Sequence, residues 1–167
     1  MSLVSQLMIS LVSTLAGAAG LGTPKEELNY SKNYTWASGV GADQADKQYR
    51  AQRTLAASAT EDLDLSGVLT DALGDAFTLA KIKKVIIAAA AGNTNNVNVT
   101  RPAANGAPVF LAAGDGIGIL PGGIFVWVAP GVAGIAITAG TADLLTVTNS
   151  GAGTSVTYDV IIEGTSA

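Results

Sequence analysis

Short apolar segments separated by Gly, Pro, Asn and Ser dominate the chain from about residue 28 onward. Many of these segments alternate apolar and polar positions with a period of two, which is typical of a half-buried β-strand. We expect strands at 28–36, at two places within 48–67, and at 85–91, 97–100, 109–113, 124–130, 134–140, 144–151 and 154–164. Their spacing predicts an all-β fold, an antiparallel β-sandwich that is jelly-roll-like in form.

The segment KKVIIAAAAGNTNNVNVT (83–100) is the one place where a helix competes with this interpretation, because four consecutive alanines favour a helix. Residues 85–87 are β-branched, however, and side chains of that shape suit a pleated sheet. Gly92 and the asparagines after it are typical of a turn, and apolar and polar residues alternate beyond them. The segment therefore predicts strand, turn and strand.

Two rows of aromatic residues follow from the alternation. The segment LNYSKNYTW places Tyr30, Tyr34 and Trp36 on one face of its strand, together with Leu28 and Lys32. An exposed row of this kind could stack on sugar rings, whereas a buried row would be core or subunit interface, and the pattern leaves both open. Phe125 and Trp127 form the second row, and we expect them to be buried because IFVWV has no polar alternation.

The N-terminal segment has a different pattern. Leu3, Leu7, Leu11 and Leu15 recur at four-residue intervals, which predicts a short amphipathic helix. A cleaved secretory signal is the alternative, but no Lys or Arg precedes Lys25. A membrane span would have to be longer and less polar. We therefore expect an N-terminal arm, helical or extended, that packs on a neighbouring subunit or on its own domain.

Composition adds a prediction about assembly. The 167 residues have the size of one domain, which we divide into an arm (1–27) and a β-sandwich (28–167). The chain is 49% hydrophobic but only 13% charged, against roughly a quarter charged in an ordinary domain. Such a surface favours burial in an oligomer, for which we prefer a homotrimer. The net charge of −4 argues against a nucleic-acid partner.

The residues that usually carry enzyme chemistry are scarce. The chain has no histidine and no cysteine, so the commonest general base and thiol chemistry are excluded. Asp62 and Asp64 would share one face of a strand, where they could bind calcium, although a solvated outer face is the simpler interpretation. The segment GDGIGILPGG (114–123) lacks the Lys-Ser/Thr ending of a phosphate-binding loop, and we expect a long turn there. We predict no catalytic, cofactor-binding or metal-binding residue, and no enzyme.

Several segments carry a resemblance to a known group of proteins. They include RTLAASATEDLDLSG, LPGGIFVWVAP and GTADLLTVTNSGAGTSVTYDVIIEGTSA, with the acidic strand start at 60–63 and the turn at 140–143. Over roughly residues 28–167 the chain resembles small structural proteins of tailed bacteriophages and prophages, some of which resemble capsid decoration or cement proteins. Residues 1–27 lie outside the resemblance.

The resemblance implies a virion protein on the outer surface of the capsid, with the major capsid protein and other copies of itself as partners. From the residues themselves we expect neither a cofactor nor a membrane partner. The alternative is a carbohydrate-binding sandwich of a phage fibre or tail, or a secreted lectin-like module. The candidate interface residues are Leu3, Leu7, Leu11, Leu15, Tyr30, Tyr34 and Trp36.

Overall fold

The computed structural model describes residues 2–18 and 21–167, and the regular elements within this part of the chain are all β-strands. In chain order they are β1 (Ser5–Ala16), β2 (Lys25–Ser38), β3 (Gln44–Ala45), β4 (Lys47–Leu55), β5 (Thr60–Asp64), β6 (Lys81–Ala89), β7 (Val97–Thr100), β8 (Gly116–Ile119), β9 (Ile124–Val128), β10 (Ile135–Ala136), β11 (Leu144–Asn149) and β12 (Val156–Thr165). The predicted all-β, sandwich-like fold is confirmed.

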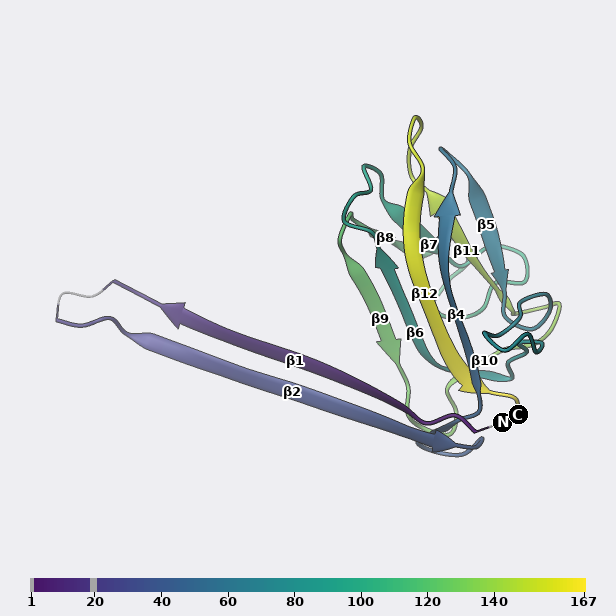
Figure 1. Ribbon diagram of the computed structural model, residues 1–167, viewed down its shortest axis with the longest axis horizontal. Coiled ribbons are helices and arrows are strands. Elements are labelled where there is room, and N and C mark those ends of the chain that lie inside the picture. The colour runs from purple at the N-terminus through teal and green to yellow at the C-terminus, as the bar shows by residue number, and fades with distance from the viewer. Residues whose placement is uncertain (1, 19–20) are drawn as a thin grey trace.

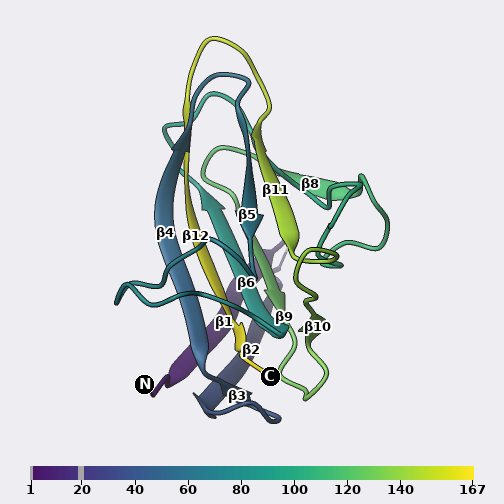
Figure 2. The ribbon, with the colours of Figure 1, turned by 90° about the vertical axis from the view of Figure 1, so that its right-hand side faces the viewer.

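Two facing sheets form the body of the molecule. In the first sheet β4, β12 and β6 lie side by side, and both β9 and β10 pair with the other edge of β6. The second sheet has the order β5-β11-β7-β8. A long hairpin of β1 and β2 leaves one end of the body, close to both chain ends (Figure 1). Figure 2 looks along this hairpin, which lies behind the lower end of the body.

The core lies between the two sheets and is built from alternate residues of their strands. In the central strands β6 and β12, every second side chain is buried over residues 85–89 and 156–162. Because the inward side chains are large and apolar, they exclude water from the space between the sheets. The fully buried strand residues include Leu63, Ile82, Val85, Ile87, Val97, Val99, Leu145, Val147, Val156, Tyr158, Val160 and Ile162.

Strand β6 departs from the period of two at Lys83, which has no partner on β12. An extra residue of this kind is a β-bulge, and it shifts the face on which the following residues lie. The bulge allows Ile82 and Val85, three residues apart, both to be fully buried. Lys84 is thereby placed on the outer face of the sheet, next to the base of the hairpin.

At three segments the conformation differs from the one expected from the sequence. The segment 109–113 was predicted as a strand, but it forms bends and turns. The glycine-rich segment 114–123 was predicted as a long turn, but its middle is strand β8, which pairs with β7. Glycine gives little strand propensity, so the pairing with β7 decides the conformation there. Residues 134–140 contain only the two-residue strand β10.

The predicted N-terminal helix is wrong. Residues 5–16 form strand β1, which pairs with β2 along its whole length. Leucines at four-residue intervals fit either element, since an even spacing also keeps side chains on one face of a strand. The extended alternative is the form found. Strand β2 runs across the expected boundary at residue 27, so the projecting arm, β1 and β2 together, continues to Ser38.

Candidate protein interaction surface

The register of the hairpin gives the arm one apolar face. Directly opposite residues of an antiparallel pair point to the same side, and Leu7 lies opposite Tyr34 while Leu11 lies opposite Tyr30. The leucine stripe and the aromatic row, predicted as separate features, therefore meet on one face. Its apolar members, hereafter the arm's apolar face, are Leu7, Ile9, Leu11, Leu15, Leu28, Tyr30, Tyr34 and Trp36. Leu3 precedes β1 and is half-buried.

Exposure along the arm's apolar face rises from base to tip. Trp36, at the base, is 1% exposed, and Tyr34 stacks on it with ring centroids 5.9 Å apart. Farther out, Leu11 is 51% and Leu15 is 74% exposed. The outer two thirds of the face consequently has no cover within the described part of the chain.

The opposite face of the arm is mostly polar. Gln6 Nε2 donates a hydrogen bond of 3.0 Å to Asn33 Oδ1 across the two strands. Met8 and Val12 also lie on this side, separated by Ser10. The arm is thus a two-sided ribbon with one predominantly apolar face, on which Lys32 and Glu26 of β2 also lie. This pattern favours packing of that face on another surface.

A buried lysine fixes the base of the arm to the body. Lys84 on β6 donates a hydrogen bond of 2.8 Å to Ser5 Oγ, and its Nζ lies 4.7 Å from the centroid of the Trp36 ring. A cation over an indole face is attracted by the ring's negative π surface, more strongly when water is excluded. Both strands of the arm are therefore held by one side chain of the body.

The charge of Lys84 is balanced by Glu163 on β12. The Lys84 Nζ lies 2.7 Å from Glu163 Oε2, and both side chains are at least nine-tenths buried. Gln48 Nε2 donates a hydrogen bond of 2.7 Å to the other carboxylate oxygen. Because each charge has a partner and further hydrogen bonds, the pair can be held away from water. Three strands of the sheet thus contribute to the anchor of the arm.

A second apolar surface lies beside this anchor, on the outer face of the five-stranded sheet. Ile161 of β12 lies opposite Ile86 of β6, which in turn lies opposite Val126 of β9. The three side chains form one row across the sheet, hereafter the sheet row, directly next to the row of Glu163 and Lys84. All three are only half-buried. The outer face of a sandwich normally carries polar residues, so an apolar row there is unusual.

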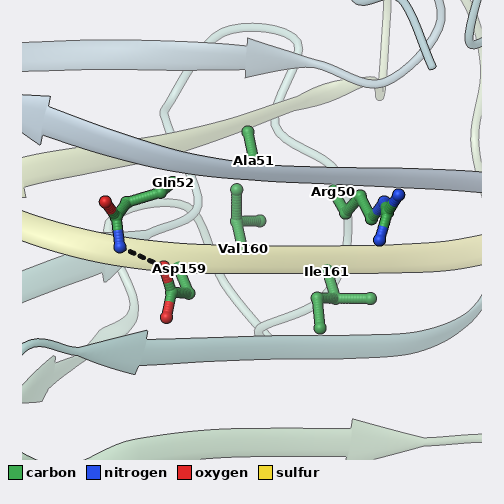
Figure 3. A pocket seen from close by; sticks show the side chains of 6 residues that line it. All are labelled: Arg50, Ala51, Gln52, Asp159, Val160 and Ile161. Atoms are coloured by element: carbon green, nitrogen blue, oxygen red, sulfur yellow. Dashed lines mark hydrogen bonds between the residues drawn. The ribbon is translucent and has the colours of Figure 1, made fainter. Parts of the chain in front are cut away.

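An open hollow adjoins the sheet row at its β12 end. Its lining includes Arg50, Gln52, Asp159 and Ile161, and its volume is about 360 Å³ (Figure 3). Gln52 Nε2 donates a hydrogen bond of 3.0 Å to Asp159 Oδ1. Gln52 and Asp159 therefore lie at one end of the hollow, and Arg50 and Ile161 lie at the other (Figure 3). Such a mixture of polar and apolar groups is typical of the margin of a protein interface.

Sequence reasoning missed several members of these surfaces. Ile9 was not assigned to the apolar face, although its spacing from Leu11 is even. The sheet row could not be predicted, because its residues lie in continuous apolar segments such as residues 85–87. Such segments do not show which residue faces outward. The pair of Lys84 and Glu163 joins residues far apart in the chain, and no local pattern indicates it.

The aromatic row does not form an open platform for a sugar. Trp36 is buried beneath the arm's base and Tyr34 is half-buried against it, which leaves Tyr30 as the exposed ring, at 53%. Phe125 and Trp127, expected to be buried, are half-buried and pack against the core. The aromatic side chains thus serve packing at most of these positions.

The two candidate carboxylates of β5 are engaged locally. Asp62 Oδ1 accepts a hydrogen bond of 2.5 Å from Thr146 Oγ1, and Asp64 Oδ1 accepts one of 3.0 Å from the Ser66 backbone N–H. No cluster of three or more His, Cys, Asp or Glu occurs among the described residues. Within that same part of the chain, no helix has the length and apolar character needed to cross a membrane.

Comparison with known proteins adds nothing to this picture. The chain matches no family model, no curated protein and no solved structure. Its function is therefore inferred from the arm, its anchor and the outer face of the sheet.

Proposed function

We propose that the protein is a structural virion protein that decorates and stabilises a bacteriophage capsid as a homo-oligomer, with a homotrimer as the preferred state. The observation that carries the proposal is the arm, whose apolar face is open to solvent over most of its length. An isolated two-stranded hairpin is marginally stable in water. An apolar surface of this kind marks contact with another protein.

The body supports the same proposal at a coarser level. The orders β4-β12-β6-β9 and β5-β11-β7-β8 are consistent with a jelly roll, which we propose as the finer description of the sandwich. Jelly rolls occur in viral capsid proteins and also in lectins. Because a fold does not determine function, this support applies to the carbohydrate-binding alternative as well. The buried base of the aromatic row favours assembly over sugar binding.

The proposed mechanism is cooperative attachment. Each copy would contact the major capsid protein on the outer surface of the shell, and a closed oligomer would make several modest contacts at once. Linked contacts of this kind raise the overall affinity without any single strong site. No catalytic group or cofactor is needed for this role.

The test is to purify intact heads of the phage or prophage that carries this gene and to quantify the protein against the major capsid protein by mass spectrometry. We expect many copies per head, in a fixed ratio. Two matched variants, Leu11→Asp on the apolar face and Val12→Asp on the polar face, should differ in their amount on heads. We expect only Leu11→Asp to be lost from heads. Absence of the native protein from heads would contradict the proposal, and a few copies on tails would favour the carbohydrate-binding alternative.

A further inference from the structure

We propose that the arm's apolar face docks on the outer face of the five-stranded sheet of a neighbouring copy, an inference that rests on the self-association proposed above. Two apolar surfaces of the chain lack a cover among the described residues. One is the arm's apolar face and the other is the sheet row of Ile86, Val126 and Ile161, with the 62% exposed Ile124 nearby. One type of contact between copies would cover both.

The arm cannot cover the sheet row of its own chain along its length. It leaves the lower end of the body and extends sideways, well beyond the edge at β9 (Figure 1). Its base is held in that direction by Lys84, which contacts both Ser5 and Trp36. The outer part of the arm is therefore displayed to a second molecule.

The contact between Trp36 and Lys84 at the base of the arm indicates which kind of surface the arm's apolar face can pack on. Trp36 already packs over the outer face of the five-stranded sheet, at Lys84. The sheet row begins with the next outward-facing residues, Ile86 and Ile161. The proposed contact thus extends an existing packing of the same two surfaces, now between copies, as a third layer of sheet on the sandwich. Sheets stack in this way at about 10 Å separation.

The size of the arm sets the area of this contact. With 12 residues in β1, and about 3.4 Å per residue and roughly 5 Å between strands, one face of the arm measures roughly 40 by 10 Å. Each arm–sheet contact would therefore bury about 400 Å² on each copy, roughly half of what one partner contributes to an interface of standard size. Because every subunit of a ring takes part in two such contacts, the closed ring holds each copy twice.

The pairing of unlike surfaces also fits the preferred oligomer. Where the docking is not exchanged between just two copies, an arm on a sheet makes a head-to-tail contact, and contacts of that type form rings such as a trimer when the rotation between copies closes. Packing of one arm on another arm would be isologous and would give a dimer. Arm-on-arm packing would also leave the sheet row of Ile86, Val126 and Ile161 uncovered.

Because the native chain has no cysteine, the contact can be tested by cross-linking of introduced thiols. We would co-express Leu11→Cys with a second chain that carries Ile161→Cys and a fused tag, so that each pair has its own mass. A short bismaleimide reagent is then added to the purified oligomer. We expect a mixed band of one tagged and one untagged chain.

Two controls make the result specific. Ser10→Cys lies next to Leu11 but on the opposite face of the arm, and should give no mixed band with Ile161→Cys. Thr148→Cys lies on the outer face of the other sheet, and should give none with Leu11→Cys. Light scattering of the native chain is measured in parallel, to establish whether it is an oligomer.

The outcomes separate the docking from the function on which it rests. A monomeric native chain would overturn both the proposed self-association and the docking. An oligomer without the mixed band would overturn the docking alone. A band of two Leu11→Cys chains without a mixed band would show that the arms pack on each other, and would also overturn the docking. The mixed band, absent in both controls, supports the proposal.

Discussion

Arg53 and Glu61 form an ion pair that links the two sheets at the edge where β4 faces β5. Glu61 also accepts a hydrogen bond of 2.8 Å from the Tyr158 hydroxyl, and Arg53 donates one of 3.0 Å to the Tyr49 hydroxyl. Burial alone would raise the pKa of Glu61, but the hydrogen bonds from Arg53 and Tyr158 together lower it. Burial and the neighbouring Glu61 raise the pKa of Tyr158, so its hydroxyl remains a donor.

This network predicts a pH dependence of stability. A carboxyl whose pKa is lowered by folding contributes stability above its unfolded pKa of about 4.3, and that contribution is lost as the pH falls through the folded pKa. Glu61→Gln should cost about 1–3 kcal/mol near neutral pH, because Arg53 loses its charged partner. The difference from the native chain should narrow below about pH 4.

Urea unfolding of both chains across this pH range checks the prediction. Asp62→Asn, on the neighbouring outward position of β5, serves as the control for the loss of one carboxylate that has no partner across the two sheets. A difference between the native chain and Glu61→Gln that stays constant down to about pH 2 would exclude the proposed role of the ion pair.

The arm is the element on which the proposed function depends, and its anchor is the buried pair of Lys84 and Glu163. Removing one partner of such a pair leaves an uncompensated buried charge, which typically costs 3–5 kcal/mol. We therefore expect Glu163→Gln to lower the free energy of unfolding by about that amount. Asp159→Asn, on the same face of β12 but exposed, should change it by no more than about 0.5 kcal/mol.

Urea unfolding at one fixed protein concentration makes this comparison, because the stability of an oligomer depends on concentration. The anchor would have no such energetic role if both variants lay within about 0.5 kcal/mol of the native chain.

Strands with a strong alternation of apolar and polar residues could be predicted from the sequence. The conformation of β1 could not, because it depends on pairing with β2. The alternation at 28–36, 97–100 and 144–151 correctly indicated strands, since the period of two is imposed by one buried face. The leucine stripe of β1 fits a helix and a strand equally, and only its pairing with β2 selects the strand. A short stretch of sequence around β1 does not include its partner strand, so it cannot indicate this pairing.

The candidate surface was partly predictable for the same reason. Leu7, Leu11, Leu15, Tyr30 and Tyr34 were identified as candidates from spacing alone. Their meeting on one face depends on the hairpin register. The anchor and the sheet row depend on tertiary contacts and on the bulge at Lys83, which spacing does not indicate.

As a whole, the molecule separates a well-packed body from an arm that is incomplete alone. The body buries its apolar residues between two sheets, while the arm keeps most of its apolar face open. A fully buried leucine or isoleucine contributes about 1.5–3 kcal/mol, so covering even a few of these side chains would provide the free energy for association. The central claim is therefore that the native chain is a closed oligomer held by the arm's apolar face.

The most direct measurement is the mass in solution, by size exclusion with light scattering at micromolar concentration, of the native chain, Leu11→Asp and Val12→Asp. We predict a small multiple of 16.7 kDa for the native chain, three being preferred. Val12→Asp should keep that mass, because the substitution lies on the polar face, whereas Leu11→Asp should shift toward the monomer. A monomeric native chain, or equal masses for the two variants, would contradict the account.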